Sequence, residues 1–227
     1  MVTFGLVTEG RTDYIVIKSI LHGYFNTFDD IVVYSLHPEE LRDETNKHRV
    51  ENYTGWYAVF DYCQTPEFKQ AFQSSDYIII QIDTDVSEEK HYDISKIENG
   101  IELSPEQLIE KVVAKFKSLI GEEFYAAHLD RIIFAISVHS IECWLLPLYY
   151  KDNKKSKLKS CLRTLNQALQ KQEGFTIDAK NPEYYEIISE KYGKHKTLMK
   201  LYKNNPSLKI FIEEVEKRNI VIEEDDF

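Results

Sequence analysis

Residues 77–82, YIIIQI, form the most apolar short run of the chain. Ser74, Ser75 and Asp76 precede this run, and Asp83 follows it directly. A short apolar run between polar stops is typical of a strand that is buried on both faces of a parallel sheet. We therefore predict a central strand at residues 77–82 that leads directly into an acidic side chain.

Three other apolar runs predict further strands, at residues 2–7, 30–36 and 131–138. The segments between them carry helical patterns at residues 12–25, at 56–71 with a break near Pro66, and at 104–121. The last has Ser104 as its N-cap, Pro105 at its first position and Gly121 as its stop. Residues 38–54 and 84–102 are polar, so we predict loops there, and 141–150 should form a helix that packs on the sheet. This order predicts an α/β fold with a mostly parallel sheet flanked by helices.

Beyond Lys151 the sequence shows only helical patterns, separated by turn signals near Gly174, Asn181, Gly193 and Asn205. We therefore predict two parts, an α/β domain at residues 1–150 and an α-helical C-terminal extension at 151–227.

The chain has 28 basic and 38 acidic residues, which gives a formal net charge of −10. A surface of this charge repels polyanions, so any contact with nucleic acid must be local. One segment has the opposite sign, because residues 151–163, KDNKKSKLKSCLR, hold six basic residues and one acid. A basic run is also typical of a solvated helix face, and both interpretations stay open.

The three cysteines, Cys63, Cys143 and Cys161, show neither CxxC nor Cys/His spacing. We therefore predict reduced thiols, with no disulfide framework and no structural zinc site. No stretch is long and apolar enough for a membrane span, and the N-terminus lacks the layout of a signal peptide. These features predict a cytoplasmic protein.

Acidic residues follow three of the predicted strands: Glu9 after the first, Asp83 and Asp85 after the third, and Glu142 after the fourth. Asp13 lies four residues after Glu9, at the start of a helix. In an open parallel sheet the carboxyl ends of the strands form the ligand site. Clustered carboxylates repel one another unless a cation compensates them, and oxygen ligands favour Mg²⁺ or Mn²⁺. The alternative is that such acids only form turns or cap helices.

Two motifs carry a resemblance to a known family. Residues 7–21, VTEGRTDYIVIKSIL, resemble the first motif of TOPRIM domains, and residues 78–85, IIIQIDTD, resemble the second. The resemblance implies an acid/base or metal-ligand role for Glu9 and a Mg²⁺-binding role for Asp83 and Asp85, with Asp13 as a further candidate ligand. TOPRIM domains usually carry another Asp shortly after the second motif, whereas Val86 and Ser87 follow here.

Residues 137–150, SVHSIECWLLPLYY, are similar to a segment of TOPRIM-like proteins of bacterial anti-phage defence, which include OLD-type nucleases, RloB-like proteins and the PARIS effector. This similarity adds Glu142 to the acidic set. Lys194 lies in a basic cluster and is a candidate for neutralising a phosphate, although a solvated helix end explains the cluster equally well.

The resulting hypothesis is a Mg²⁺- or Mn²⁺-dependent nuclease that acts on DNA or RNA as a defence effector. Because the chain has no GxxxxGK[ST] motif, an ATPase of the OLD or ABC type would be a separate chain. The resemblance also implies a homodimer. Two alternatives stay open: a catalytically weak TOPRIM-like module that binds a partner ATPase or a phage protein, and a small-molecule phosphotransferase or nucleotide hydrolase.

Overall fold

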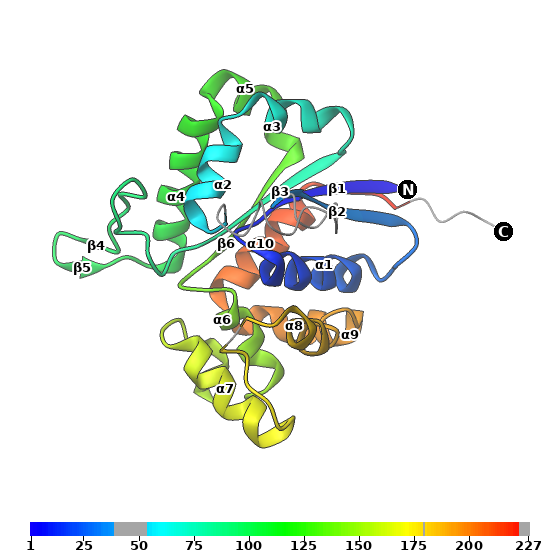
Figure 1. Ribbon diagram of the computed structural model, residues 1–227, viewed down its shortest axis with the longest axis vertical. Coiled ribbons are helices and arrows are strands. Elements are labelled where there is room, and N and C mark those ends of the chain that lie inside the picture. The colour runs from blue at the N-terminus through cyan, green and yellow to red at the C-terminus, as the bar shows by residue number, and fades with distance from the viewer. Residues whose placement is uncertain (39–53, 179, 223–227) are drawn as a thin grey trace.

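The computed structural model describes residues 1–38, 54–178 and 180–222. Its main sheet has four parallel strands in the order β2-β1-β3-β6. Helices cover both faces of this sheet, which confirms the predicted α/β fold (Figure 1). The strands are β1 (Val2–Val7), β2 (Ile31–His37), β3 (Tyr77–Asp83) and β6 (Ile132–Ser137).

The central strand β3 is buried on both faces because its side chains alternate between two hydrophobic cores. Ile79 belongs to one core, whereas Ile78, Ile80 and Ile82 belong to the other. The second core is covered by α2 (Trp56–Cys63), α3 (Pro66–Gln70), α4 (Pro105–Ile120) and α5 (Glu122–His128), and the first by α1 (Arg11–Phe25) and α10 (Pro206–Lys217).

Most predicted helices are present with nearly the expected ends. Ser104 and Gln107 form the capping box of α4, because the Gln107 N–H donates to Ser104 Oγ at 3.3 Å and the Ser104 N–H donates to Gln107 Oε1 at 2.9 Å. The break near Pro66 separates α2 from α3 as predicted.

Two segments differ from the prediction. The segment 84–102 is not entirely loop, because it contains a small antiparallel hairpin of β4 (Ile97–Glu98) and β5 (Ile101–Glu102). The predicted helix at 141–150 is shorter: α6 (Glu142–Leu145) continues only as a 3-10 turn at Leu146–Leu148. Pro147 lacks a backbone N–H, which is one reason why an α-helix does not continue there. Residues 39–53 of the loop predicted at 38–54 lie outside the described residues.

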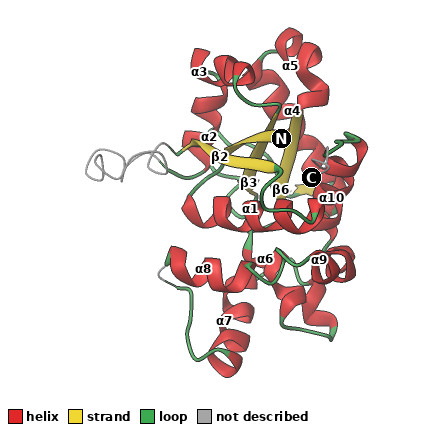
Figure 2. Cartoon of the chain, turned by 90° about the vertical axis from the view of Figure 1, so that its right-hand side faces the viewer, coloured by secondary structure: helices red, strands yellow, loops and turns green. Residues whose placement is uncertain are grey.

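The C-terminal part forms α7 (Cys161–Gln172), α8 (Pro182–Ser189), α9 (His195–Leu201) and α10. In Figure 2, α6, α8 and α9 lie beyond α1, on the side away from the strands. Side chains of these helices share one core with β1 and β3. The contact of α1 with the C-terminal part is close at Gly23, where a Cβ atom would lie 1.8 Å from the Tyr192 carbonyl oxygen. The helical part is therefore docked on the α/β part through a shared apolar core.

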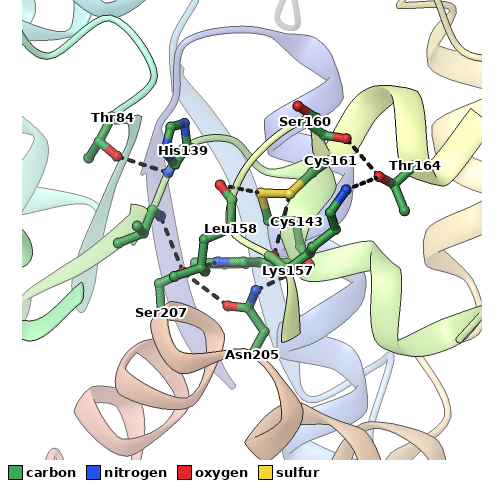
Figure 3. The surroundings of a disulfide bond; sticks show 12 residues. Thr84, His139, Cys143, Lys157, Leu158, Ser160, Cys161, Thr164, Asn205 and Ser207 are labelled. Carbon is green, nitrogen blue, oxygen red and sulfur yellow. Dashed lines mark hydrogen bonds between the residues drawn. A yellow bond between two sulfur atoms is a disulfide. The ribbon is translucent and has the colours of Figure 1, made fainter. Parts of the chain in front are cut away.

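The prediction of three reduced thiols is wrong for two cysteines, because Cys143 and Cys161 form a disulfide (Figure 3). These residues are 18 positions apart, and the packing of α7 against α6 brings their Cα atoms to 5.0 Å, a separation that suits a disulfide. Cys63 is a buried free thiol, as predicted. Within the described residues, no helix combines the length and apolarity needed to cross a membrane.

Candidate metal centre

Glu9 and Asp83 meet where two neighbouring parallel strands end. β1 ends at Val7, two residues before Glu9, and Asp83 is the last residue of β3. The Asp83 N–H donates to Glu9 Oε1 at 2.6 Å. Gln81 joins them, because it accepts from the Glu9 N–H at 3.2 Å and its Nε2 donates to Asp83 Oδ1 at 2.9 Å. The two carboxylates are therefore held in one hydrogen-bonded unit.

Asp13 and Glu142 extend this unit into the helical side of the molecule. Asp13 lies in the first turn of α1 and Glu142 is the first residue of α6, and both are 4% exposed. Tyr185, on α8, donates its hydroxyl hydrogen to Glu142 Oε1 at 2.6 Å. We call Glu9, Asp13, Asp83 and Glu142 the acidic centre.

Three carboxyl groups of the acidic centre, those of Glu9, Asp13 and Asp83, resist ionisation. Burial, reinforced by the charge of Asp13, raises the pKa of Glu9 to about 8. Burial also raises the pKa of Asp13 to about 7, against the lowering effect of Lys180, and Glu142 adds to the rise. Burial and the neighbouring Glu9, Asp13 and Glu142 carboxylates hold the pKa of Asp83 well above its usual range. Such shifts are typical of carboxylates that lack a compensating cation.

Lys180 supplies part of that compensation. Burial disfavours its charged form, but the charges of Asp13, Glu142, Asp83 and Glu9 outweigh this and keep its pKa above the ordinary value. Lys180 directly precedes Asn181, the N-cap of α8, so the start of this helix carries a cation toward the acidic centre. One lysine cannot balance four carboxylates, and the centre retains a deficit of positive charge.

Asp85 lies at the rim of the acidic centre rather than inside it. The resemblance implies a Mg²⁺-binding role for both Asp83 and Asp85, but β3 ends at Asp83 and Asp85 is exposed. The chain turns there toward the end of β6, since the Thr84 and Asp85 N–H groups both donate to the His139 carbonyl at 2.9 Å. Lys96 Nζ donates to the backbone carbonyl of Asp85. The Asp85 side chain is thus the solvent-facing member of the predicted pair.

Lys194 is not brought to the acidic centre. It is exposed and forms the N-cap of α9, next to His195, whose Nδ1 contacts the Gly23 carbonyl at 2.8 Å. Gly23 lies near the C-terminal end of α1, whereas Asp13 lies in its first turn. Ten residues of helix separate them, or about 15 Å.

Sequence reasoning missed three residues that complete the centre: Gln81, Lys180 and Tyr185. Gln81 carried a signal in the sequence, because it is a polar residue inside the apolar run 77–82. The structure shows that it is fully buried. Lys180 and Tyr185 carried none, because only the docking of α8 against α1 brings them to the acids.

The residues present suit a hard divalent cation. Within residues 1–38, 54–178 and 180–222, no three His, Cys, Asp or Glu side chains lie close enough to enclose an ion. Mg²⁺ does not require such a cage, because it keeps several waters and commonly binds one or two carboxylates together with substrate phosphates. Glu9, Asp83 and Asp85 offer those oxygens, and the charge deficit of the acidic centre favours a cation there.

Comparisons of the chain with protein-family models, with characterised proteins and with solved structures find no significant match.

Tyr185→Phe tests whether the hydroxyl of Tyr185 stabilises the buried carboxylate of Glu142. Hydrogen bonds to charged groups contribute about 1.5 to 3 kcal/mol, so we expect the free energy of unfolding to fall by about 2 kcal/mol in urea denaturation. Tyr184→Phe is the matched control, because this neighbouring ring stacks on Phe175 and its hydroxyl makes no hydrogen bond within the described residues. Equal losses in both variants would contradict the assignment.

Proposed function

We propose that this chain is a Mg²⁺- or Mn²⁺-dependent phosphodiesterase that cleaves nucleic acid. The observation that carries the proposal is the acidic centre itself: four carboxylates gather from the ends of β1 and β3 and the starts of α1 and α6, with one partly compensating lysine, and the pKa values of Glu9, Asp13 and Asp83 are raised. The resemblance of residues 7–21 and 78–85 to the TOPRIM motifs supports the same chemistry. The similarity of residues 137–150 to TOPRIM-like defence proteins extends the proposal to an effector of anti-phage defence.

In this proposal one or two of the carboxylates of Glu9, Asp83 and Asp85 would bind the metal ion directly, and the others would contact it through its bound waters. When bound, the ion would polarise a phosphate oxygen and lower the pKa of water. Glu9 is also the candidate acid/base, because a carboxyl group with a pKa of about 8 exchanges protons near neutral pH in the metal-free protein. Gln81 and the Asp83 N–H orient the two carboxylates, and Tyr185 orients Glu142.

Lys180 takes the role that the sequence suggested for Lys194. It is the cation that interacts with all four carboxylates of the acidic centre, and it would offset their repulsion of an incoming phosphate. Its position just before α8 makes the proposed activity depend on the C-terminal helices as well as on the sheet.

A cleavage assay tests the proposal. We expect end-labelled single- or double-stranded DNA or RNA to be cut by the purified chain with Mg²⁺ or Mn²⁺, and to stay intact in EDTA. Turnover of mononucleotides without cleavage of polymers would instead assign a nucleotide hydrolase. Failure to cleave any substrate with either metal would overturn the proposed activity of the isolated chain and favour the partner-binding alternative.

A further inference from the structure

A basic hollow lies on the helical side of the molecule, apart from the acidic centre. Its volume is about 720 Å³, within the range of sites that bind ligands. Residues from the segment 147–155, the end of α7, α9 and the turn after it line this hollow. Four lysines contribute to the lining: Lys151, Lys155, Lys196 and Lys200. No Asp or Glu occurs among the described residues that line it. We call this feature the lysine groove.

The four lysines carry uncompensated charge. In the described part of the chain, none of them takes part in an ion pair, although six other lysines and arginines do. Lys151, Lys196 and Lys200 are exposed to solvent. In a chain of net charge −10, four unpaired lysines around one hollow mark a local reversal of the surface potential. The ligand that matches this reversal is a polyanion.

The arrangement of the lysines favours a chain of phosphates over a single one. Lys196 and Lys200 are four positions apart on α9, so they lie on the same face of that helix. Lys151 and Lys155 are also four positions apart, on a different segment of the lining. A single phosphate is held by donors that converge on one point, whereas two separate pairs of cations suit a backbone with repeated charges.

The aromatic side chains of the lysine groove favour contacts with phosphates over stacking of nucleobases. Lys191 Nζ lies 4.2 Å from the ring centroid of Tyr149, and Lys154 Nζ lies 5.0 Å from that of Tyr150. Each cation covers one face of its ring, so a nucleobase would have to displace it to stack on that face. Contacts to phosphate therefore dominate, and binding should be independent of sequence and sensitive to salt.

The lysine groove and the acidic centre each include one end of the same short segment. Glu142 and Tyr149 are seven positions apart on mostly helical chain, a rise of about 10 Å. We propose that the lysine groove binds the phosphate backbone of a nucleic acid and leads it toward the acidic centre. Its role as a substrate path rests on the proposed nuclease function, whereas the binding itself does not.

Fluorescence anisotropy with labelled oligo(dT) and oligo(U) of about 20 nucleotides, in EDTA, tests this proposal over about 50 to 200 mM salt. We expect Lys151→Gln/Lys196→Gln/Lys200→Gln to bind about tenfold more weakly than wild type. Its log–log salt slope should be smaller by about 2, because each phosphate contact contributes about 0.7. The matched control, Lys69→Gln/Lys171→Gln/Lys209→Gln, removes three exposed charges outside the groove and should bind like wild type.

Equal binding by the two triple variants, whether both are weakened or both unchanged, overturns the lysine groove as the binding site. A cleavage assay on the same proteins separates this result from the proposed function. If only the groove variant loses binding and the wild type cleaves no substrate, the lysine groove stands as a binding site and the proposed nuclease function is overturned. If the groove variant binds and cleaves nucleic acid as well as the control variant does, the proposed nuclease function stands and the lysine groove is overturned as the binding site.

Discussion

Asp83→Asn should lower the rate of phosphodiester cleavage by about a thousandfold while raising the stability of the metal-free protein. The substitution removes a metal-ligating charge, and a thousandfold loss corresponds to about 4 kcal/mol of transition-state stabilisation. Asparagine keeps the size of the side chain and an oxygen that can accept from Gln81. Because the other three carboxylates raise the pKa of Asp83, the neutral side chain relieves their repulsion.

The expected loss of cleavage and gain in stability distinguish a specific effect of Asp83→Asn from general misfolding. We expect the melting temperature at about pH 8 in EDTA to rise by roughly 2 to 4 °C, which is the shift that 1 kcal/mol produces in a chain of this size. A variant that merely misfolds would lose both activity and stability. Asp130→Asn is the control, because Asp130 is exposed and lies outside the acidic centre. Cleavage by Asp83→Asn at the wild-type rate would remove Asp83 from the proposed site.

The metal-free protein should lose about 6 kcal/mol of stability between about pH 5 and pH 8, because Glu9 and Asp13 each contribute about 1.4 kcal/mol per pH unit over most of this range. The pKa of Glu9 is raised from 4.5 to about 8 and that of Asp13 from 3.8 to about 7. In this window the folded state binds more protons than the unfolded state, so the free energy of unfolding falls as the pH rises. The stabilisation is complete below the unfolded pKa values and is lost as the pH passes through 7 to 8.

Urea denaturation at several pH values, in EDTA and in Mg²⁺, measures this loss. Metal ions and protons compete for the same carboxylates, so Mg²⁺ should stabilise the protein more at about pH 8 than at about pH 5. Glu9→Gln/Asp13→Asn should flatten the pH dependence in EDTA, because neither side chain then titrates. An unchanged slope in this double variant would show that the pH dependence arises elsewhere.

The sheet was predictable because its signals are local. The apolar run at residues 77–82, bounded by polar residues, identifies β3 from a few neighbouring positions, and Ser104, Pro105 and Gly121 fix the ends of α4 in the same way. The acids Glu9, Asp83 and Glu142 were predictable as a group for a related reason: parallel strands place their carboxyl ends at one edge.

Contacts made by the C-terminal helices were not predictable from local patterns. Lys194 is a candidate for neutralising a phosphate because many basic residues lie near it in the sequence. The density of basic residues along the sequence does not show which end of α1 a lysine will reach. Lys180 reaches the acids because α8 docks across α1. The pairing of Cys143 with Cys161 has the same origin, since it depends on how α7 packs against α6 rather than on a motif.

The acidic centre and the residues that contact it span most of the described chain, from Glu9 to Tyr185, and this has a consequence for protein synthesis. Chains emerge from the ribosome N-terminus first at about 5 to 20 residues per second. Glu9, Asp13, Asp83 and Glu142 therefore emerge before Lys180 and Tyr185, which complete the centre. The last of these reaches solution roughly 2 to 9 seconds after Glu142, at that rate over the intervening residues. For this period the nascent chain contains the four acids of the acidic centre without the contacts of Lys180 and Tyr185. Those contacts form only after α8 has docked.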